Sequence, residues 1–119
     1  DKIYPPENKN LYSQIMKKGL IISEIAFGLS PKAQFFPQRN RIISGLSLGT
    51  LVVEASFKSG SLITARFALE QNREIFAVPG SPLDQRCQGT NNLIKKGAKL
   101  VEKSEDIIEV IKYLDNNDY

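Results

Sequence analysis

Short apolar runs alternate with helix-forming segments along most of this chain, and that alternation limits the folds open to it. The runs that end near Glu54 and Val78 are continuously apolar, which is typical of strands buried on both faces of a parallel sheet. The pattern predicts strands at 20–22, 50–54, 74–78 and 99–101, and helices at 8–19, 37–46, 61–72, 90–96 and from Ser104. We therefore predict a doubly wound α/β fold, with a mostly parallel sheet and helices on both faces.

The composition is that of an ordinary globular protein. At 119 residues and 13.3 kDa, the chain has room for one domain, which we place over residues 1–119. No apolar run approaches the length of about 20 residues that spans a bilayer, so we expect no membrane association. Cys87 is the only cysteine, and no charged-then-apolar leader precedes Tyr4. We therefore expect a cytoplasmic protein.

Charge is distributed unevenly along the chain. The formal net charge is +3, but residues 1–99 hold 14 Lys and Arg against 7 Asp and Glu, whereas residues 100–119 hold 2 against 6. The acidic end is typical of a solvated helix face, and the basic remainder is compatible with a polyanionic partner. A lysine-rich surface also occurs in proteins that bind no polyanion, so charge alone does not assign nucleic-acid binding.

The segment FPQRNRIISGL, from Phe36 to Leu46, combines two arginines with the start of a predicted helix. Pro37 suits the first helical position, where its missing N–H has no intrahelical acceptor. Arg39 and Arg41 would then lie near free backbone N–H groups, an arrangement that favours phosphate. The alternative is that both arginines are solvated or paired with carboxylates.

Further polar loops follow the predicted strands. The segment Ser59-Gly60-Ser61 opens the helix after the strand at 50–54, where Ser61 serves either as a helix cap or as part of a phosphate cradle. Two more amide-rich loops, at 78–82 and 88–92, follow the next strand. Because the carboxyl ends of parallel strands meet at one edge, we expect a single polar, electropositive rim. The glycine-rich dinucleotide and Walker motifs are both absent from the sequence.

Hydrolytic chemistry has little support in the sequence. The chain contains no histidine, which removes the usual proton shuttle and the favoured zinc ligand. Glu54, at the end of a predicted strand, either pairs with an arginine or acts as a general base. We therefore expect no enzyme activity, no metal and no cofactor.

On these residues, the chain resembles the DNA-processing protein A family, also called Smf, of bacterial natural transformation. The resemblance is carried by motifs that occur in order along the chain: Asp1-x-x-Tyr4-Pro5, Ser23-Glu24, FPQRNRIISGL, Val53-Glu54-Ala55, SGSLITA, REIFAVPG, GTNNLI, Lys96-Gly97-Ala98 and Asp106-Ile107-Ile108. It implies a Rossmann-like domain that binds single-stranded DNA, forms a homodimer and helps to load the RecA recombinase.

The resemblance also assigns roles to particular residues. It implies a DNA-binding pocket lined by Phe36, Arg39, Asn40 and Arg41, with Ser59, Gly60 and Ser61 beside it. It implies a surface for dimerisation and for RecA formed by Asn92, Leu93, Ile94 and Leu100. For Ile94 and Leu100, ordinary core packing is the alternative.

Three expectations remain open at this point. The family's domain normally begins with earlier strands and an arginine-bearing loop, so the resemblance implies that this chain is the C-terminal portion of a longer domain. A Rossmann-like nucleotide phosphoribohydrolase is one alternative, although its Pro-Gly-Gly-x-Gly-Thr-x-x-Glu run is missing here. An assembly module without DNA binding of its own is the other.

Overall fold

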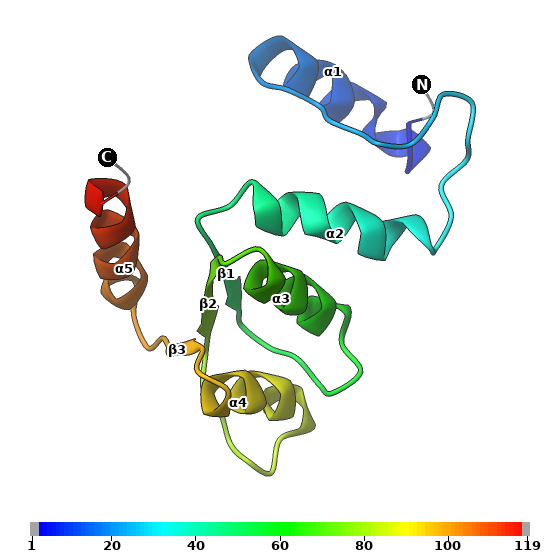
Figure 1. Cartoon of the computed structure of the whole chain (residues 1–119). Coiled ribbons are helices and arrows are strands. Elements are labelled where there is room, and N and C mark those ends of the chain that lie inside the picture. The colour runs from blue at the N-terminus through cyan, green and yellow to red at the C-terminus, as the bar shows by residue number, and fades with distance from the viewer. Residues whose placement is uncertain (1–2, 118–119) are drawn as a thin grey trace. The chain divides into compact units, whose positions relative to one another are not determined.

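A computed structural model describes residues 3–117 of the chain. The chain divides into two compact units, one ending at Arg39 and one beginning at Asn40. Helix α2, Phe35–Gly45, begins in the first unit and ends in the second (Figure 1). That residues 1–119 form a single domain stays a prediction.

The first unit carries a short 3₁₀ helix, η1 (Pro6–Asn8), followed by α1 (Lys9–Lys18). The helix ends as predicted at Gly19, whose N–H donates to the Ile15 carbonyl over 2.7 Å. Asn8 occupies the predicted cap position, but its side chain makes no capping hydrogen bond. Because none of the residues 3–39 is fully buried, this unit gains little from apolar packing.

The predicted strand at Leu20-Ile21-Ile22 is wrong. This segment has no strand conformation, and the Leu20 and Ile22 side chains are 77% and 56% exposed. A strand forms only where a neighbour accepts and donates its backbone hydrogen bonds, and within residues 3–117 no strand pairs with this segment. The apolar run signals a tendency to be buried, but it does not supply the partner.

The second unit is built on three parallel strands in the order β1 (Gly49–Val52), β2 (Glu74–Ala77) and β3 (Lys99–Leu100). Helix α3 (Gly60–Glu70) joins the first pair of strands, while η2 (Gln85–Cys87) and α4 (Gln88–Lys95) join the second. Helix α5 (Ser104–Asn117) follows β3. The predicted α/β fold with a parallel sheet is therefore confirmed, with boundaries that differ by one to three residues.

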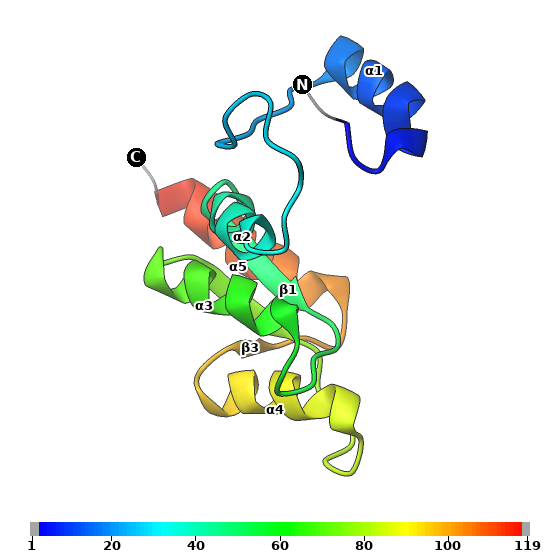
Figure 2. The ribbon, with the colours of Figure 1, turned by 90° about the vertical axis from the view of Figure 1, so that its right-hand side faces the viewer.

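Helices cover both faces of the sheet. Figures 1 and 2 show α3 and α5 on opposite sides of β1 and β2. On the α3 side, Val52 and Ala55 are buried against Ala65, which is 0% exposed, and Ile75 and Leu93 pack around them. A small side chain at Ala65 lets the helix approach the sheet closely. This face holds the core of the second unit.

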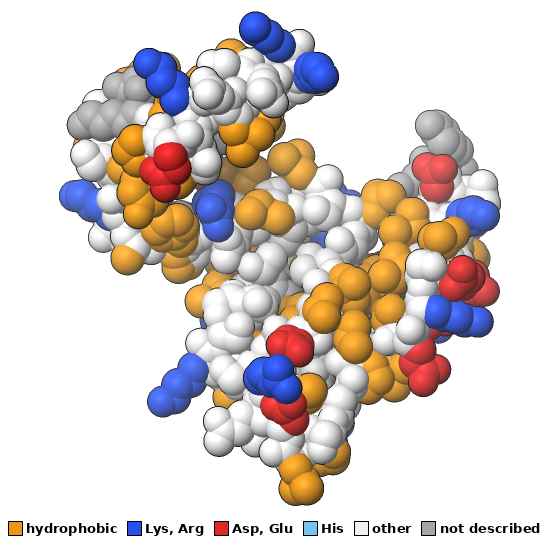
Figure 3. Space-filling model, turned by 180° about the vertical axis from the view of Figure 1, so that it is seen from behind, with side chains coloured by type: hydrophobic (Ala, Val, Ile, Leu, Met, Phe, Trp, Pro, Cys, Tyr) orange, Lys and Arg blue, Asp and Glu red, His pale blue; other side chains and the backbone are white. Residues whose placement is uncertain are grey.

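The opposite face is covered less completely. A Cβ added to Gly49 would lie 2.6 Å from the ring of Phe76, so glycine is needed beside that buried side chain. A groove of about 490 Å³ separates Leu51 from the first turn of α5 at Ile107, and Leu51 is 41% exposed. Hydrophobic side chains gather beside α5 on the face seen in Figure 3. The expectation of a sheet fully covered on both faces therefore holds only for the α3 side.

Within residues 3–117, no helix combines the length and the apolar character that crossing a bilayer requires.

Candidate nucleic-acid interface

The FPQRNR segment starts α2 two residues earlier than predicted, at Phe35. The N–H groups of Phe35 and Phe36 donate to the carbonyls of Lys32 and Ala33 over 3.0 and 3.3 Å. Pro37 has no N–H to offer. The prediction of free amides at this helix start is therefore wrong, because a preceding turn supplies their acceptors. Anion binding here depends on side chains.

Two of those side chains lie against each other. The guanidinium carbon of Arg39 lies 5.4 Å from the centroid of the Phe36 ring, one helical turn away. The Phe36 side chain is 45% exposed. An exposed aromatic face beside a guanidinium can contact a base and a phosphate of the same nucleotide. Asn40, which is half-buried, and Arg41, which is exposed, follow along the helix.

The second half of α2 is fixed by residues that the sequence did not single out. The Gln71 side-chain amide donates to the Arg41 carbonyl over 2.8 Å, and its oxygen accepts from the buried Ser44 hydroxyl over 2.7 Å. Arg73 donates to the Gly45 carbonyl over 2.8 Å. These bonds attach α2 to the end of α3. Their long-range pairing leaves no periodic signal in the sequence that could have revealed them.

The Ser59-Gly60-Ser61 segment begins α3 with an open backbone. Ser59, rather than Ser61, is the helix cap, and its hydroxyl oxygen accepts from the Ser61 N–H over 3.3 Å and contacts the Ser61 hydroxyl at 3.2 Å. A Cβ added to Gly60 would meet no atom within 4 Å. The predicted capping role of Ser61 therefore belongs to Ser59. The backbone at Gly60 is accessible to a ligand.

The two groups of predicted DNA-binding residues in the second unit lie at opposite ends of α3. The Arg41 backbone contacts Gln71 at the end of that helix, whereas Ser59, Gly60 and Ser61 form its start. A helix of 11 residues is about 16 Å long. A ligand that contacts both groups therefore has to be extended, as a single nucleic-acid strand is.

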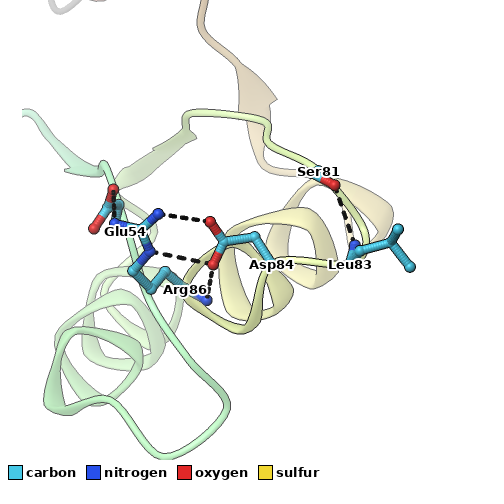
Figure 4. Close-up of polar contacts among 5 residues, drawn as sticks. All are labelled: Glu54, Ser81, Leu83, Asp84 and Arg86. Atoms are coloured by element: carbon cyan, nitrogen blue, oxygen red, sulfur yellow. Dashed lines mark hydrogen bonds and ion pairs between the residues drawn. The ribbon is translucent and has the colours of Figure 1, made fainter.

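An exposed ion cluster follows the strands at the carboxyl edge of the sheet (Figure 4). Arg86 lies 2.8 Å from the Asp84 carboxylate and 3.9 Å from that of Glu54. The hydrogen bond from the Arg86 side chain, with a second from its backbone N–H, lowers the pKa of Asp84 below its usual value. The predicted pairing of Glu54 with an arginine is confirmed. Two carboxylates around one guanidinium leave this part of the rim without the excess positive charge that we predicted.

Asn91 and Gly89 attach the loops at this edge to α4. The Asn91 side chain donates to the Gly80 carbonyl over 2.9 Å and accepts from its N–H over 3.1 Å. The Gly89 N–H donates to the Ala55 carbonyl over 2.7 Å, and a Cβ at Gly89 would lie 2.5 Å from that oxygen. These contacts fix the segments that follow β1 and β2. The amide-rich sequence at 88–92 is thus used, in part, to hold the loops.

The residues predicted for dimerisation differ in their surroundings. Leu93 packs against the core around Val52. Ile94 and Asn92 are half-buried, and Leu100 is 41% exposed on β3. Core packing therefore accounts for Leu93. For the other three residues the interface role stays a prediction.

Comparison with known proteins places these features in a family. The sequence profile of the family described as DNA recombination-mediator protein A matches residues 1–112. The chain is 51% identical over 107 residues to the DNA processing protein DprA of Bacillus subtilis, covering 90% of this chain and 36% of that protein. It is 48% identical over 108 residues to the protein Smf of Synechocystis, covering 91% of this chain and 27% of that protein.

Solved structures agree with the sequence matches. The DprA structure of Streptococcus pneumoniae is similar with a TM-score of 0.80 at 46% identity, covering 92% of this chain and 38% of that one. DprA of Helicobacter pylori, described as having a unique single-stranded DNA binding mode, gives a TM-score of 0.77 at 32% identity, covering 95% and 52%. The chain spans 27% to 40% of the length of the curated relatives with the highest similarity. Since the family profile matches nearly its whole length, this chain belongs to the DNA recombination-mediator protein A family.

Proposed function

We propose that this chain carries part of the single-stranded DNA binding surface of a DNA-processing protein. The observation that carries the proposal is the contact between Arg39 and the exposed ring of Phe36, 5.4 Å apart on α2. The Helicobacter pylori relative, which is described as binding single-stranded DNA, supports it. The proposed contacts are binding contacts, and we assign no catalytic step to them.

Each group has a physical role in this proposal. The ring of Phe36 stacks on a base, which is accessible in a single strand but hidden in a duplex. Arg39 and Arg41 neutralise phosphates, and Asn40 adds a hydrogen-bonding amide. Gly60 allows the strand to approach the backbone of α3, where the hydroxyls of Ser59 and Ser61 lie.

We further propose the cellular role that the family resemblance implies. The bound strand would be passed to the RecA recombinase during natural transformation, and the chain would act as a homodimer. Exposed Leu100 on β3, together with half-buried Ile94 on α4, supports an apolar interface at that edge of the sheet. Within residues 3–117, β3 pairs only with β2, so its other edge is open to a partner.

A salt-dependent titration tests the DNA-binding proposal. Wild-type protein should bind fluorescein-labelled oligo(dT) more tightly than a duplex of equal length, and affinity should fall as salt rises. Replacing Arg39→Ala with Arg41→Ala should weaken oligo(dT) binding about tenfold or more and reduce the salt slope by about one to two.

The matched control removes two positive charges elsewhere. Lys103→Ala with Lys112→Ala alters exposed lysines outside α2 and should leave affinity within about twofold. Circular dichroism melts show whether each variant is folded. If the arginine variant is folded and binds oligo(dT) as the wild type does, the proposed surface is wrong.

A further inference from the structure

We propose that the groove between α3 and α4 binds an acidic peptide segment of a partner protein, one that carries large aliphatic side chains. The groove has a volume of about 540 Å³, within the usual range for ligand sites. Helix α3 and helix α4 form its walls, and Figure 1 shows the two helices next to each other. None of the residues proposed to bind DNA lines it, so this inference does not rest on the DNA-binding proposal.

The interior of the groove is aliphatic. Leu69 lies on the α3 side and is 65% exposed, while Ile75 and Leu93 lie deeper and are half-buried. No aromatic side chain is among the lining residues, all of which belong to the described chain. Single-stranded nucleic acids are held largely by stacking on aromatic rings. The surface therefore suits aliphatic side chains better than bases.

Positive charge surrounds this aliphatic surface. Arg66, Arg73 and Lys96 line the groove with a single carboxylate, that of Glu74. Arg66 makes an exposed ion pair with Glu70, 3.4 Å away. Within residues 3–117, no carboxylate lies within ion-pair distance of Arg73 or Lys96. Clustered arginine and lysine beside an apolar surface is the arrangement that recognises acidic peptide motifs.

The cations are not needed to satisfy the helix ends beside them. At the end of α3, the Arg73 backbone N–H donates to the Ala68 carbonyl over 2.8 Å. At the end of α4, the Ala98 N–H donates to the Leu93 carbonyl over 2.9 Å. Backbone groups thus occupy acceptors that unpaired helix ends would otherwise present to cations. The side-chain charges remain available to a ligand.

The test uses the full chain and a short fluorescein-labelled peptide in which a pair of leucines is flanked by aspartates. Fluorescence anisotropy should show binding that weakens as salt rises. Arg66→Glu with Lys96→Glu should weaken it about tenfold or more, and Leu69→Ser about fivefold. Lys95→Glu is the matched control, because Lys95 neighbours Lys96 on the chain but does not line the groove, and it should change affinity by about twofold at most.

Three results would overturn the proposal. The first is a peptide with serines in place of leucines that binds as well as the leucine peptide, since attraction would then be purely electrostatic. The second is an equal effect of Lys95→Glu and the double variant. The third is displacement of the peptide by oligo(dT), which would identify a nucleic-acid groove. Ile94→Glu should leave peptide binding unchanged, and oligo(dT) binding should survive Arg66→Glu with Lys96→Glu, so failure here is separable from failure of the DNA-binding and dimer proposals.

Discussion

The starts of α2 and α3 carry the same kind of sequence signal and are built in different ways. At α2 the first two N–H groups are bonded to the turn before the helix, and Pro37 contributes none. At α3 the cap residue Ser59 satisfies one amide, and the backbone at Gly60 faces open space. The first start therefore offers an anion only side chains, whereas the second offers it accessible backbone.

The start of α5 is a third case. The Asp106 carboxylate accepts from the N–H groups of Glu102 and Lys103 over 2.9 and 3.1 Å. The helix thus carries its own anion at the position where a ligand would bind. The comparison teaches that a helix start is a binding site only where the chain has not already used its donors. Each of the three starts makes a prediction of different size.

The largest effect is expected at α2, where binding depends on side chains. Phe36→Leu keeps an apolar side chain and removes the aromatic face, so oligo(dT) affinity should fall about tenfold, in line with stacking energies of about 1–3 kcal/mol per base. Fluorescence anisotropy measures the change. Phe27→Leu is the matched control, since Phe27 is 89% exposed in the same unit but lies outside α2.

An equal loss in the Phe27 and Phe36 variants would mean that any exposed ring contributes. In that case the difference between α2 and the rest of the first unit would disappear.

A smaller effect is expected at α3, where the backbone is the binding group. Gly60→Ala and Gly60→Leu place side chains of increasing size in open space, so neither should destabilise the fold, because no atom lies within 4 Å of the added Cβ. Both should hinder approach of the strand, with affinity falling about twofold for alanine and about fivefold for leucine. Titration with oligo(dT) and a thermal melt measure the two properties separately.

A graded loss of affinity with unchanged melting would support backbone contact at Gly60. If both variants bind as the wild type does, α3 takes no part in holding the strand, and the side chains of α2 act alone.

Most of the fold could be predicted from local pattern. Continuous apolar runs located β1 and β2, and their parallel pairing followed from the intervening helix. The same reasoning failed at Leu20-Ile21-Ile22, because an apolar run states a preference for burial without naming a partner. Pairing is a property of the whole sheet, and a local pattern cannot supply it.

The site was less predictable than the fold. The importance of Ser59-Gly60-Ser61 followed from its place after a strand, but the choice between Ser59 and Ser61 as the cap depended on a helix boundary that sequence sets only to within a few residues. The bonds from Gln71 to Arg41 and to Ser44 join residues 27 to 30 positions apart. No spacing rule connects such residues, so only the folded chain reveals them.

The smallest effect is expected at α5 and concerns pH. Backbone hydrogen bonds from Glu102, then from Lys103, lower the pKa of Asp106 below its usual value. A carboxyl group whose pKa is lower in the folded state contributes stability above its unfolded pKa, about 3.9 for aspartate, and loses that contribution as pH falls through the folded value. Asp106→Asn should therefore melt at a lower temperature than the wild type at neutral pH. The difference should shrink below about pH 4 as the wild-type carboxyl takes up its proton.

Asp115→Asn is the matched control, because Asp115 is an exposed carboxylate near the other end of the same helix. It lacks the backbone donors of the first turn, so its substitution should leave the melting temperature nearly unchanged at both pH values. A pH-independent deficit in Asp106→Asn would mean that the side chain acts through its shape or packing. The start of α5 would then not be closed by charge, and its contrast with the open start of α3 would rest on geometry alone.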